Sequence, residues 1–156
     1  MPNLKQHSRR VRFSLAWFDA VKLQDTTVFL NPLINEYFYS ALHMFEACAV
    51  AFPGLMTQTD FYSHVERNAE LGRIVMQALH PLQPMTAPYE TLSGLSRRAR
   101  YIQISRQLPV SPIKPKDLKT ARDSFEVIRA TIESHFVTHA TDKTPPWHRA
   151  EDLLDS

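Results

Sequence analysis

Residues 31–54 read NPLINEYFYSALHMFEACAVAFPG. Apolar residues recur in this segment at three- and four-residue steps: Ile34, Phe38, Ala41, Phe45, Cys48 and Phe52. The flanking positions are also mostly apolar, and a helix that is apolar nearly all round lies at the centre of its bundle. Asn31-Pro32 provides an N-cap followed by a proline at the first helical position, and Pro53-Gly54 ends the segment. We therefore predict a central, buried helix over residues 31–52.

Four amphipathic segments surround this helix in the sequence. We predict helices over residues 8–23, 63–79, 88–102 and 116–139. Ser63, with Glu66 three positions later, has the spacing of a capping box. Glycine occurs three times, the eleven prolines fall mainly between the periodic segments, and no segment sustains an alternation of period two. The expected fold class is all-α, an up-and-down bundle of about five helices.

The length of 156 residues fits one domain. We expect a helical domain over residues 1–141 and a poorly ordered acidic tail over residues 142–156. Residues 107–115, which contain three prolines, are expected to form a stiff loop. No internal repeat or low-complexity segment stands out.

Cysteine usage and hydropathy indicate where such a chain folds. Cys48 is the only cysteine, so no intramolecular disulfide can form and a reducing compartment is expected. Its apolar neighbours favour a buried structural thiol over a nucleophile. No apolar run reaches the ~20 residues that a membrane-spanning helix needs, and the N-terminal residues lack the pattern of a signal peptide. The expected location is the cytoplasm, with no membrane contact.

Basic residues cluster although the formal net charge is only +2. Arg9, Arg10 and Arg12 precede the first acidic residue, Asp19, and residues 97–119 contain seven basic residues against one acid. Such clusters are typical of proteins with an anionic partner, and they also occur on ordinary solvated faces. Both interpretations stay open at the level of the sequence.

Three segments carry a family likeness in a fixed order: EYFYSALH at 36–43, SHVERN at 63–68 and YETLSGLSRRARY at 89–101. The first resembles the Tyr-Tyr-Ala-Ala-Leu-His opening of a central helix in many HEPN proteins. The second resembles a Ser-His-x-x-Arg-Asn segment of some members, and the third a Tyr-x-x-Leu…Arg-x-x-Ala-x-Tyr helix. The resemblance implies an up-and-down helical bundle, a homodimer, and an association with RNA and with defence or toxin–antitoxin systems.

Active HEPN proteins cut RNA without a metal, through an Arg-x(4–6)-His motif at the dimer interface. RNA supplies its own nucleophile in the 2′-hydroxyl, so a histidine base and a cation suffice. The spacing occurs here at Arg73…His80 and Arg129…His135, but chance alone predicts about one or two matches. No histidine follows the arginines of residues 97–100 within the permitted window. We therefore expect no standard HEPN nuclease chemistry.

The catalytic candidates are His43, His64 and Arg67. His43 lies on a polar stripe of the central helix near Glu46, either as a base oriented by that carboxylate or as a hydrogen-bonded core histidine. His64 and Arg67 open the third helix, either to hold an anion or as part of a solvated first turn.

The nucleic-acid-binding candidates are Arg97, Arg98, Arg100 and Ser40, and one of the arginines could instead pair with an acid such as Glu46 or Glu70. His135 and His139 have an i, i+4 metal-binding spacing without an identifiable third ligand, so we expect no metal and no other cofactor. The favoured function is association with RNA or a nucleoprotein partner through a basic groove. The alternatives are a metal-independent endoribonuclease and a protein-interaction module.

Overall fold

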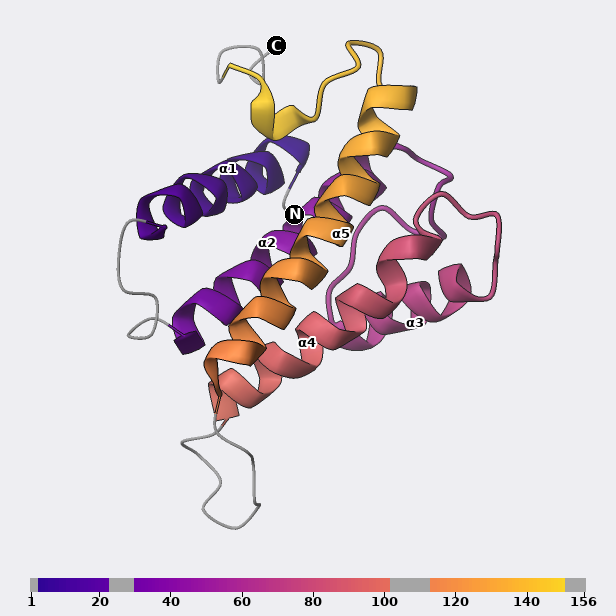
Figure 1. Cartoon of the computed structure of the whole chain (residues 1–156). Coiled ribbons are helices and arrows are strands. Elements are labelled where there is room, and N and C mark those ends of the chain that lie inside the picture. The colour runs from indigo at the N-terminus through magenta and orange to yellow at the C-terminus, as the bar shows by residue number, and fades with distance from the viewer. Residues whose placement is uncertain (1–2, 23–29, 102–112, 151–156) are drawn as a thin grey trace.

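The computed structural model describes residues 3–22, 30–101 and 113–150. Within these ranges the chain contains no strand and five α-helices, which are α1 (Leu4–Val21), α2 (Leu30–Ala51), α3 (His64–Val75), α4 (Thr86–Tyr101) and α5 (Pro115–His139) (Figure 1). Two short 3-10 helices, η2 (Gln83–Met85) and η3 (Pro146–His148), accompany them. The expected all-α bundle is confirmed. None of the helices in these ranges combines the length and the apolar character that crossing a membrane would require.

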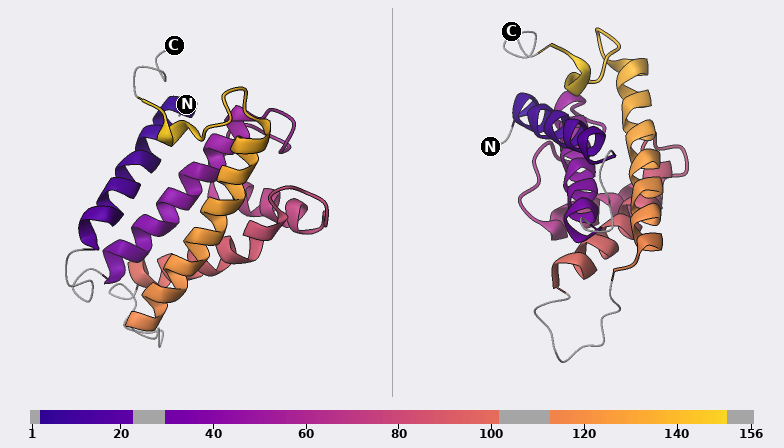
Figure 2. Two further views of the ribbon diagram at one scale, coloured as in Figure 1. Left: turned by 45° about the horizontal axis from the view of Figure 1, so that its top comes forward. Right: turned by 60° about the vertical axis from the view of Figure 1, so that its left-hand side comes forward.

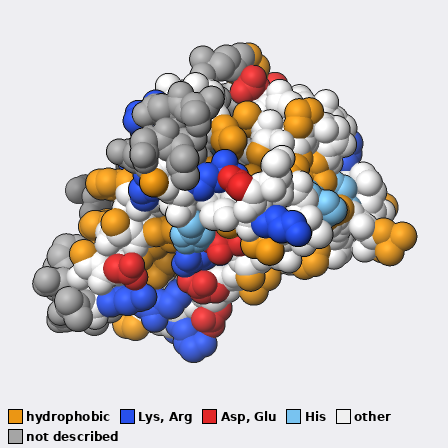
Figure 3. Space-filling view, turned by 90° about the horizontal axis from the view of Figure 1, so that it is seen from above, with side chains coloured by type: hydrophobic (Ala, Val, Ile, Leu, Met, Phe, Trp, Pro, Cys, Tyr) orange, Lys and Arg blue, Asp and Glu red, His pale blue; other side chains and the backbone are white. Residues whose placement is uncertain are grey.

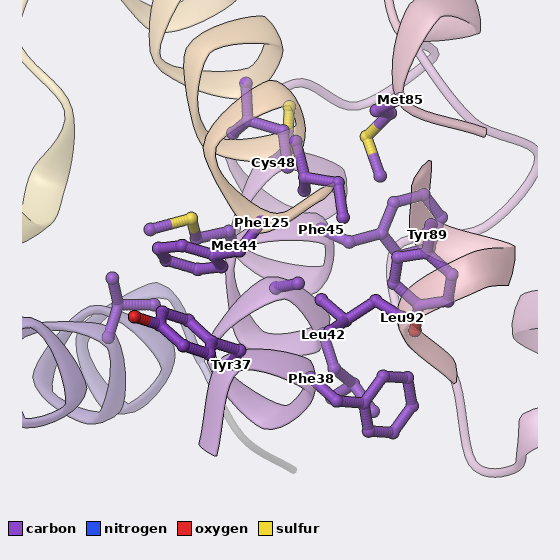
Figure 4. Packing of buried hydrophobic residues seen from close by; sticks show 14 of the residues in the cluster. Tyr37, Phe38, Leu42, Met44, Phe45, Cys48, Met85, Tyr89, Leu92 and Phe125 are labelled. Atoms are coloured by element: carbon purple, nitrogen blue, oxygen red, sulfur yellow. The ribbon is translucent and has the colours of Figure 1, made fainter. Parts of the chain in front are cut away.

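Helix α2 is the central element, as its all-round apolar pattern predicts. It packs against α1, α4 and α5 (Figure 2). Most of its 22 residues are buried. The fully buried Phe45 ring lies between Phe61 and Tyr89, with ring centroids 5.3 and 6.0 Å away, and Figure 4 shows it beside Tyr89. Complete burial of such a side chain contributes roughly 1.5–3 kcal/mol. One continuous hydrophobic core therefore forms around this helix.

The helix ends follow the local capping chemistry, but several differ from the predicted boundaries: α1 begins at Leu4, capped by Asn3, rather than at residue 8, and α4 spans Thr86–Tyr101 rather than residues 88–102. The capping box of Ser63 and Glu66 is present at the start of α3. Helix α2 begins one residue before Asn31, so Asn31 is no N-cap; its side chain donates instead to the Ala99 carbonyl at 3.1 Å. Helix α3 ends at Val75 rather than at residue 79, because turn-type hydrogen bonds such as that from Gln77 N to Ile74 O replace the helical ones.

The segment that follows α5 corrects the prediction of a poorly ordered tail over residues 142–156. Residues 142–150 fold back onto the bundle, and Trp147 is buried with its ring centroid 5.4 Å from that of Phe136. The indole Nε1 donates to Glu133 at 2.8 Å, and Arg12 of α1 donates to the Trp147 carbonyl at 3.2 Å. The apolar surface and the hydrogen bonds of one tryptophan therefore extend the domain to residue 150. Residues 151–156, and most of the predicted loop at 107–115, lie outside the described residues.

Candidate functional site

A line of polar side chains crosses the bundle from α3 through α2 to α1. Arg67 donates from Nη1 to Glu46 Oε1 at 2.8 Å, and its Nη2 lies 3.3 Å from His64 Nδ1. The other carboxylate oxygen of Glu46 lies 3.4 Å from His7 Nδ1. His7 Nδ1 lies in turn 3.0 Å from His43 Nδ1. These five residues are called the polar network below.

Local sequence positions each member of the network. His43 and Glu46 are three residues apart on α2 and so share one face of that helix, as do His64 and Arg67 on α3. The capping box at Ser63 fixes where α3 begins, and Asn3 caps α1 so that His7 falls in its second turn. Three separately capped or packed helices therefore bring three histidines and an ion pair together.

The network is buried at its centre and open at its ends. His7, Glu46 and Arg67 are 3%, 7% and 9% exposed, whereas His43 is half-buried and His64 is exposed. Breaking a buried ion pair by removing one partner typically costs about 3–5 kcal/mol, because the remaining charge has no compensation. The Glu46–Arg67 pair therefore holds α2 and α3 together as well as linking the histidines.

Burial and neighbouring charges set the protonation of the network. Burial lowers the pKa of His43 to about 4, and electrostatic interactions with the Arg10 and Arg67 guanidinium groups and with the His7 ring act in the same direction. Burial also lowers the pKa of His7, which the nearby Asp60 carboxylate partly offsets. Both rings are therefore neutral at pH 7. Burial raises the pKa of Glu46, and the Arg67 guanidinium opposes that change.

A basic face lies at the α3 end of the network. We use that name for His64, Arg97 and Arg100, with Arg67 beneath them. Desolvation lowers the pKa of His64, and the charges of Arg67, Arg100 and Arg97 lower it further, so three guanidinium groups act on one exposed imidazole. Arg100 donates to the Tyr39 hydroxyl at 2.7 Å. This arrangement brings the predicted His64, Arg67, Arg97 and Arg100 into one neighbourhood.

Aromatic rings and a groove adjoin the basic face. The guanidinium of Arg100 lies 5.8 Å from the ring centroid of Phe38 and 5.7 Å from that of Tyr39. Tyr62, two residues before His64, is 71% exposed. Between α3 and α4 runs a groove of about 560 Å³, which Arg97 lines together with the small residues Gly72 and Gly94. The face of the molecule seen from above in Figure 3 carries basic, acidic and histidine side chains intermixed.

Two nucleic-acid-binding candidates are placed differently from the prediction. Ser40 is fully buried on α2, so it cannot touch a nucleic acid at the surface, and we withdraw it as a candidate. Arg98 Nη2 lies 3.5 Å from Asp117 Oδ2 of α5, so this arginine pairs with an acid of the bundle. The acids suggested as partners of the α4 arginines bond elsewhere: Glu46 pairs with Arg67, and Glu70 lies 2.5 Å from an arginine of its own helix.

The two Arg–His pairs of nuclease-like spacing are engaged in structural contacts. His80 Nε2 lies 2.9 Å from the Leu55 carbonyl oxygen, and its Nδ1 accepts from the Leu82 amide. Arg73 donates to Glu70 and to the Thr57 hydroxyl. These contacts give the first pair a role in joining loops to α3.

The second pair is similarly engaged. Arg129 Nε donates to Glu133 Oε1 at 3.0 Å. The His135 ring packs edge-on against Phe52, with ring centroids 4.6 Å apart. His135 and His139 lie together with ring centroids 4.5 Å apart, but they gain no third metal-ligating side chain among the described residues.

His7 is the member of the network that sequence reasoning missed. Its only signal is its spacing of four residues from Val11, which continues the buried face of α1 through Ser14 and Phe18. That spacing predicts an inward side chain, but it does not predict which residue of α2 lies opposite.

Comparison of the chain with family models, with curated proteins and with solved structures finds no match. The resemblance to HEPN proteins therefore stays a prediction that rests on the three quoted segments.

Proposed function

We propose that this protein binds single-stranded RNA through the basic face of α3 and α4. The observation that carries the proposal is the convergence of the Arg67, Arg97 and Arg100 charges on the exposed His64. Clustered cations attract the phosphate backbone, and this term supplies most sequence-independent affinity for nucleic acids. Arg97 is exposed and lines the groove between the two helices, so it is the cation best placed to meet a phosphate.

The aromatic side chains next to the basic face favour a single strand over a duplex. Proteins that hold single strands combine a positively charged groove with aromatic rings on which bases stack. Tyr62 and Tyr39 supply such rings here, one of them largely exposed and the other half-buried under Arg100. The resemblance to HEPN proteins, many of which are tied to RNA, supports the same class of ligand.

Metal-independent RNA cleavage at this face is a second candidate, which the environment of His64 favours. Its lowered pKa keeps the imidazole neutral at pH 7, as a general base for a 2′-hydroxyl must be. A neighbouring guanidinium could stabilise the charge that develops on the phosphorane. Arg67 Nη2 donates to His64 Nδ1, which carries the lone pair of the neutral ring, so the RNA would have to displace this 3.3 Å contact for cleavage. His64 would then be the base and Arg97 or Arg100 the cation, rather than either of the two Arg-x(4–6)-His matches.

The test is a fluorescence-anisotropy titration of a labelled single-stranded RNA of mixed sequence at low salt. The variant Arg97→Ala/Arg100→Ala should bind at least about tenfold more weakly, since each lost charge-assisted contact is worth about 1.5 kcal/mol or more. Lys116→Ala/Lys119→Ala is the matched control, because it removes two positive charges from the exposed start of α5. This control should bind as the parent does.

Each other outcome has a definite meaning. A parent protein that binds no RNA at low salt, or a double arginine variant that binds like the parent, would contradict the proposal and favour the protein-interaction module. RNA that is shortened by the parent but left intact by a folded His64→Ala variant would establish the second candidate.

A further inference from the structure

We propose that His7, His43 and Glu46 form a binding site for a divalent transition-metal ion, with zinc as the best match. The ligand atoms offered by these three side chains all lie within 4.8 Å of one another, at the α1–α2 end of the polar network. The inference is independent of RNA binding, because the basic face lies at the other end of that network.

The distances suit a tetrahedral metal. His7 Nδ1 lies 3.0 Å from His43 Nδ1 and 3.4 Å from Glu46 Oε2. Ligand atoms that sit 2.0–2.1 Å from a tetrahedral zinc are roughly 3.3–3.4 Å from each other. Two imidazoles and one carboxylate are also a known set of protein ligands for zinc with an open fourth position. Two of the three pairs therefore lie near the tetrahedral spacing, and side-chain rotations that bring His43 and Glu46, now within 4.8 Å, closer together would surround an ion.

Protons alone satisfy these three atoms poorly. A neutral imidazole carries one N–H, so a hydrogen bond between the two Nδ1 atoms uses a proton on one ring and the lone pair of the other. If His7 is the acceptor, its lone pair also faces the Glu46 oxygen. If His7 is the donor, one proton must serve both His43 and Glu46. A cation at the centre interacts favourably with all three atoms at once.

The surroundings support a positive ion at this place. A neutral imidazole offers one nitrogen lone pair to a metal ion, and His7 and His43 each bring their Nδ1 atom to the cluster. Arg67 donates to the second oxygen of Glu46 and orients that carboxylate, as outer partners of metal ligands do. The charge of Asp60 acts on His7 and Glu46 and adds negative potential to the site.

Two cations also act on the site. The charges of Arg10 and Arg67 lower the pKa of His43 and so oppose a metal ion. Each of them has a carboxylate partner, since Arg10 lies 3.5 Å from Glu36 and Arg67 lies 2.8 Å from Glu46. With Asp60 included, the fixed charges around the site do not exclude a divalent cation. His43, which is half-buried, gives the ion a route from solvent.

The test is isothermal titration of the chelator-treated full chain with zinc chloride, together with visible absorption on adding cobalt chloride. One ion per chain should bind with a Kd below about 10 μM, a range in which a site with three protein ligands is readily distinguished from weak surface binding. Cobalt should give the intense visible absorption of a four-coordinate site. A zinc Kd above about 10 μM, or the weak absorption spectrum that cobalt has in water, would overturn the proposal.

Two variants locate the ion. His43→Gln removes one ligand at the half-buried position and should weaken zinc binding by more than about 100-fold, beyond the 10–100-fold typical of outer-shell changes. His135→Gln/His139→Gln removes the other close histidine pair and should bind zinc like the parent. Zinc should raise the Tm of the parent and of this control, but not that of His43→Gln. Loss of binding in the control, with binding kept in His43→Gln, would show adventitious binding at α5 and would overturn the proposal.

Discussion

Glu46 holds its carboxylate inside the bundle through two partners, Arg67 on α3 and His7 on α1. Arg67→Met should destabilise the protein by about 3–5 kcal/mol, because it leaves a buried carboxylate uncompensated. In Arg67→Met/Glu46→Leu much of that loss should be recovered, since both charges are gone. The exposed pair of Lys119 and Asp123 supplies the control, where Lys119→Ala should cost about 0.5 kcal/mol or less. Urea unfolding measures the free energy of unfolding of the three variants. If Arg67→Met lost no more stability than Lys119→Ala, the Glu46–Arg67 pair would not be a stabilising buried ion pair.

The lowered pKa of His43, about 4 against an ordinary 6.5, makes a second prediction at the scale of the residue. Below pH 6.5 the unfolded chain binds a proton at this ring that the folded chain does not yet bind, so stability falls with decreasing pH until about pH 4. The loss should reach at most about 3 kcal/mol. Unfolding measured at pH 7 and pH 4.5 with a chelator present should show it, and His43→Gln should reduce the difference. An equal pH dependence in both proteins would mean that His43 does not titrate as described.

At the scale of the helix, α2 should tolerate loss of volume least. Phe45 is fully buried against Phe61 and Tyr89, so Phe45→Ala should cost about 3–5 kcal/mol through lost burial and a residual cavity. Val65→Ala on the exposed side of α3 is the control and should change stability by less than about 0.5 kcal/mol. A Phe45→Ala cost below about 1 kcal/mol would mean that α2 is peripheral.

What the sequence predicts differs between elements, for physical reasons. The central position of α2 follows from its apolar pattern, and the start of α3 follows from the Ser63 capping box, because both signals are local. The docking of Trp147 and the meeting of His7 with His43 depend on how distant segments pack, which periodicity does not encode. The sequence pattern places Ser40 on the polar stripe of α2 and among the nucleic-acid-binding candidates, but its side chain is fully buried, because local polarity does not determine which helix covers that position. Local chemistry therefore predicted the helices, but not the network that connects His7 with His43 and Glu46.

For the whole molecule, we predict a homodimer, on the basis of the resemblance to HEPN proteins. Apolar side chains remain at the surface around the end of α3, where Met76 is 84% and Leu79 is 98% exposed. Sedimentation at micromolar concentration should show a species of twice the 18.0 kDa chain, and Met76→Asp/Leu79→Asp should shift it toward the monomer if this patch forms the interface. A parent protein that sediments only at 18.0 kDa would contradict the prediction.

The salt dependence of RNA affinity tests most directly whether the basic face binds the phosphate backbone. For single strands, the slope of log K against log salt is about −0.7 for each phosphate neutralised. Arg97→Ala/Arg100→Ala should therefore make the slope shallower by about 1.4, while Lys116→Ala/Lys119→Ala leaves it unchanged and both variants keep the helical content of the parent. The same slope in the parent and in the folded arginine variant would contradict the assignment of RNA binding to α3 and α4.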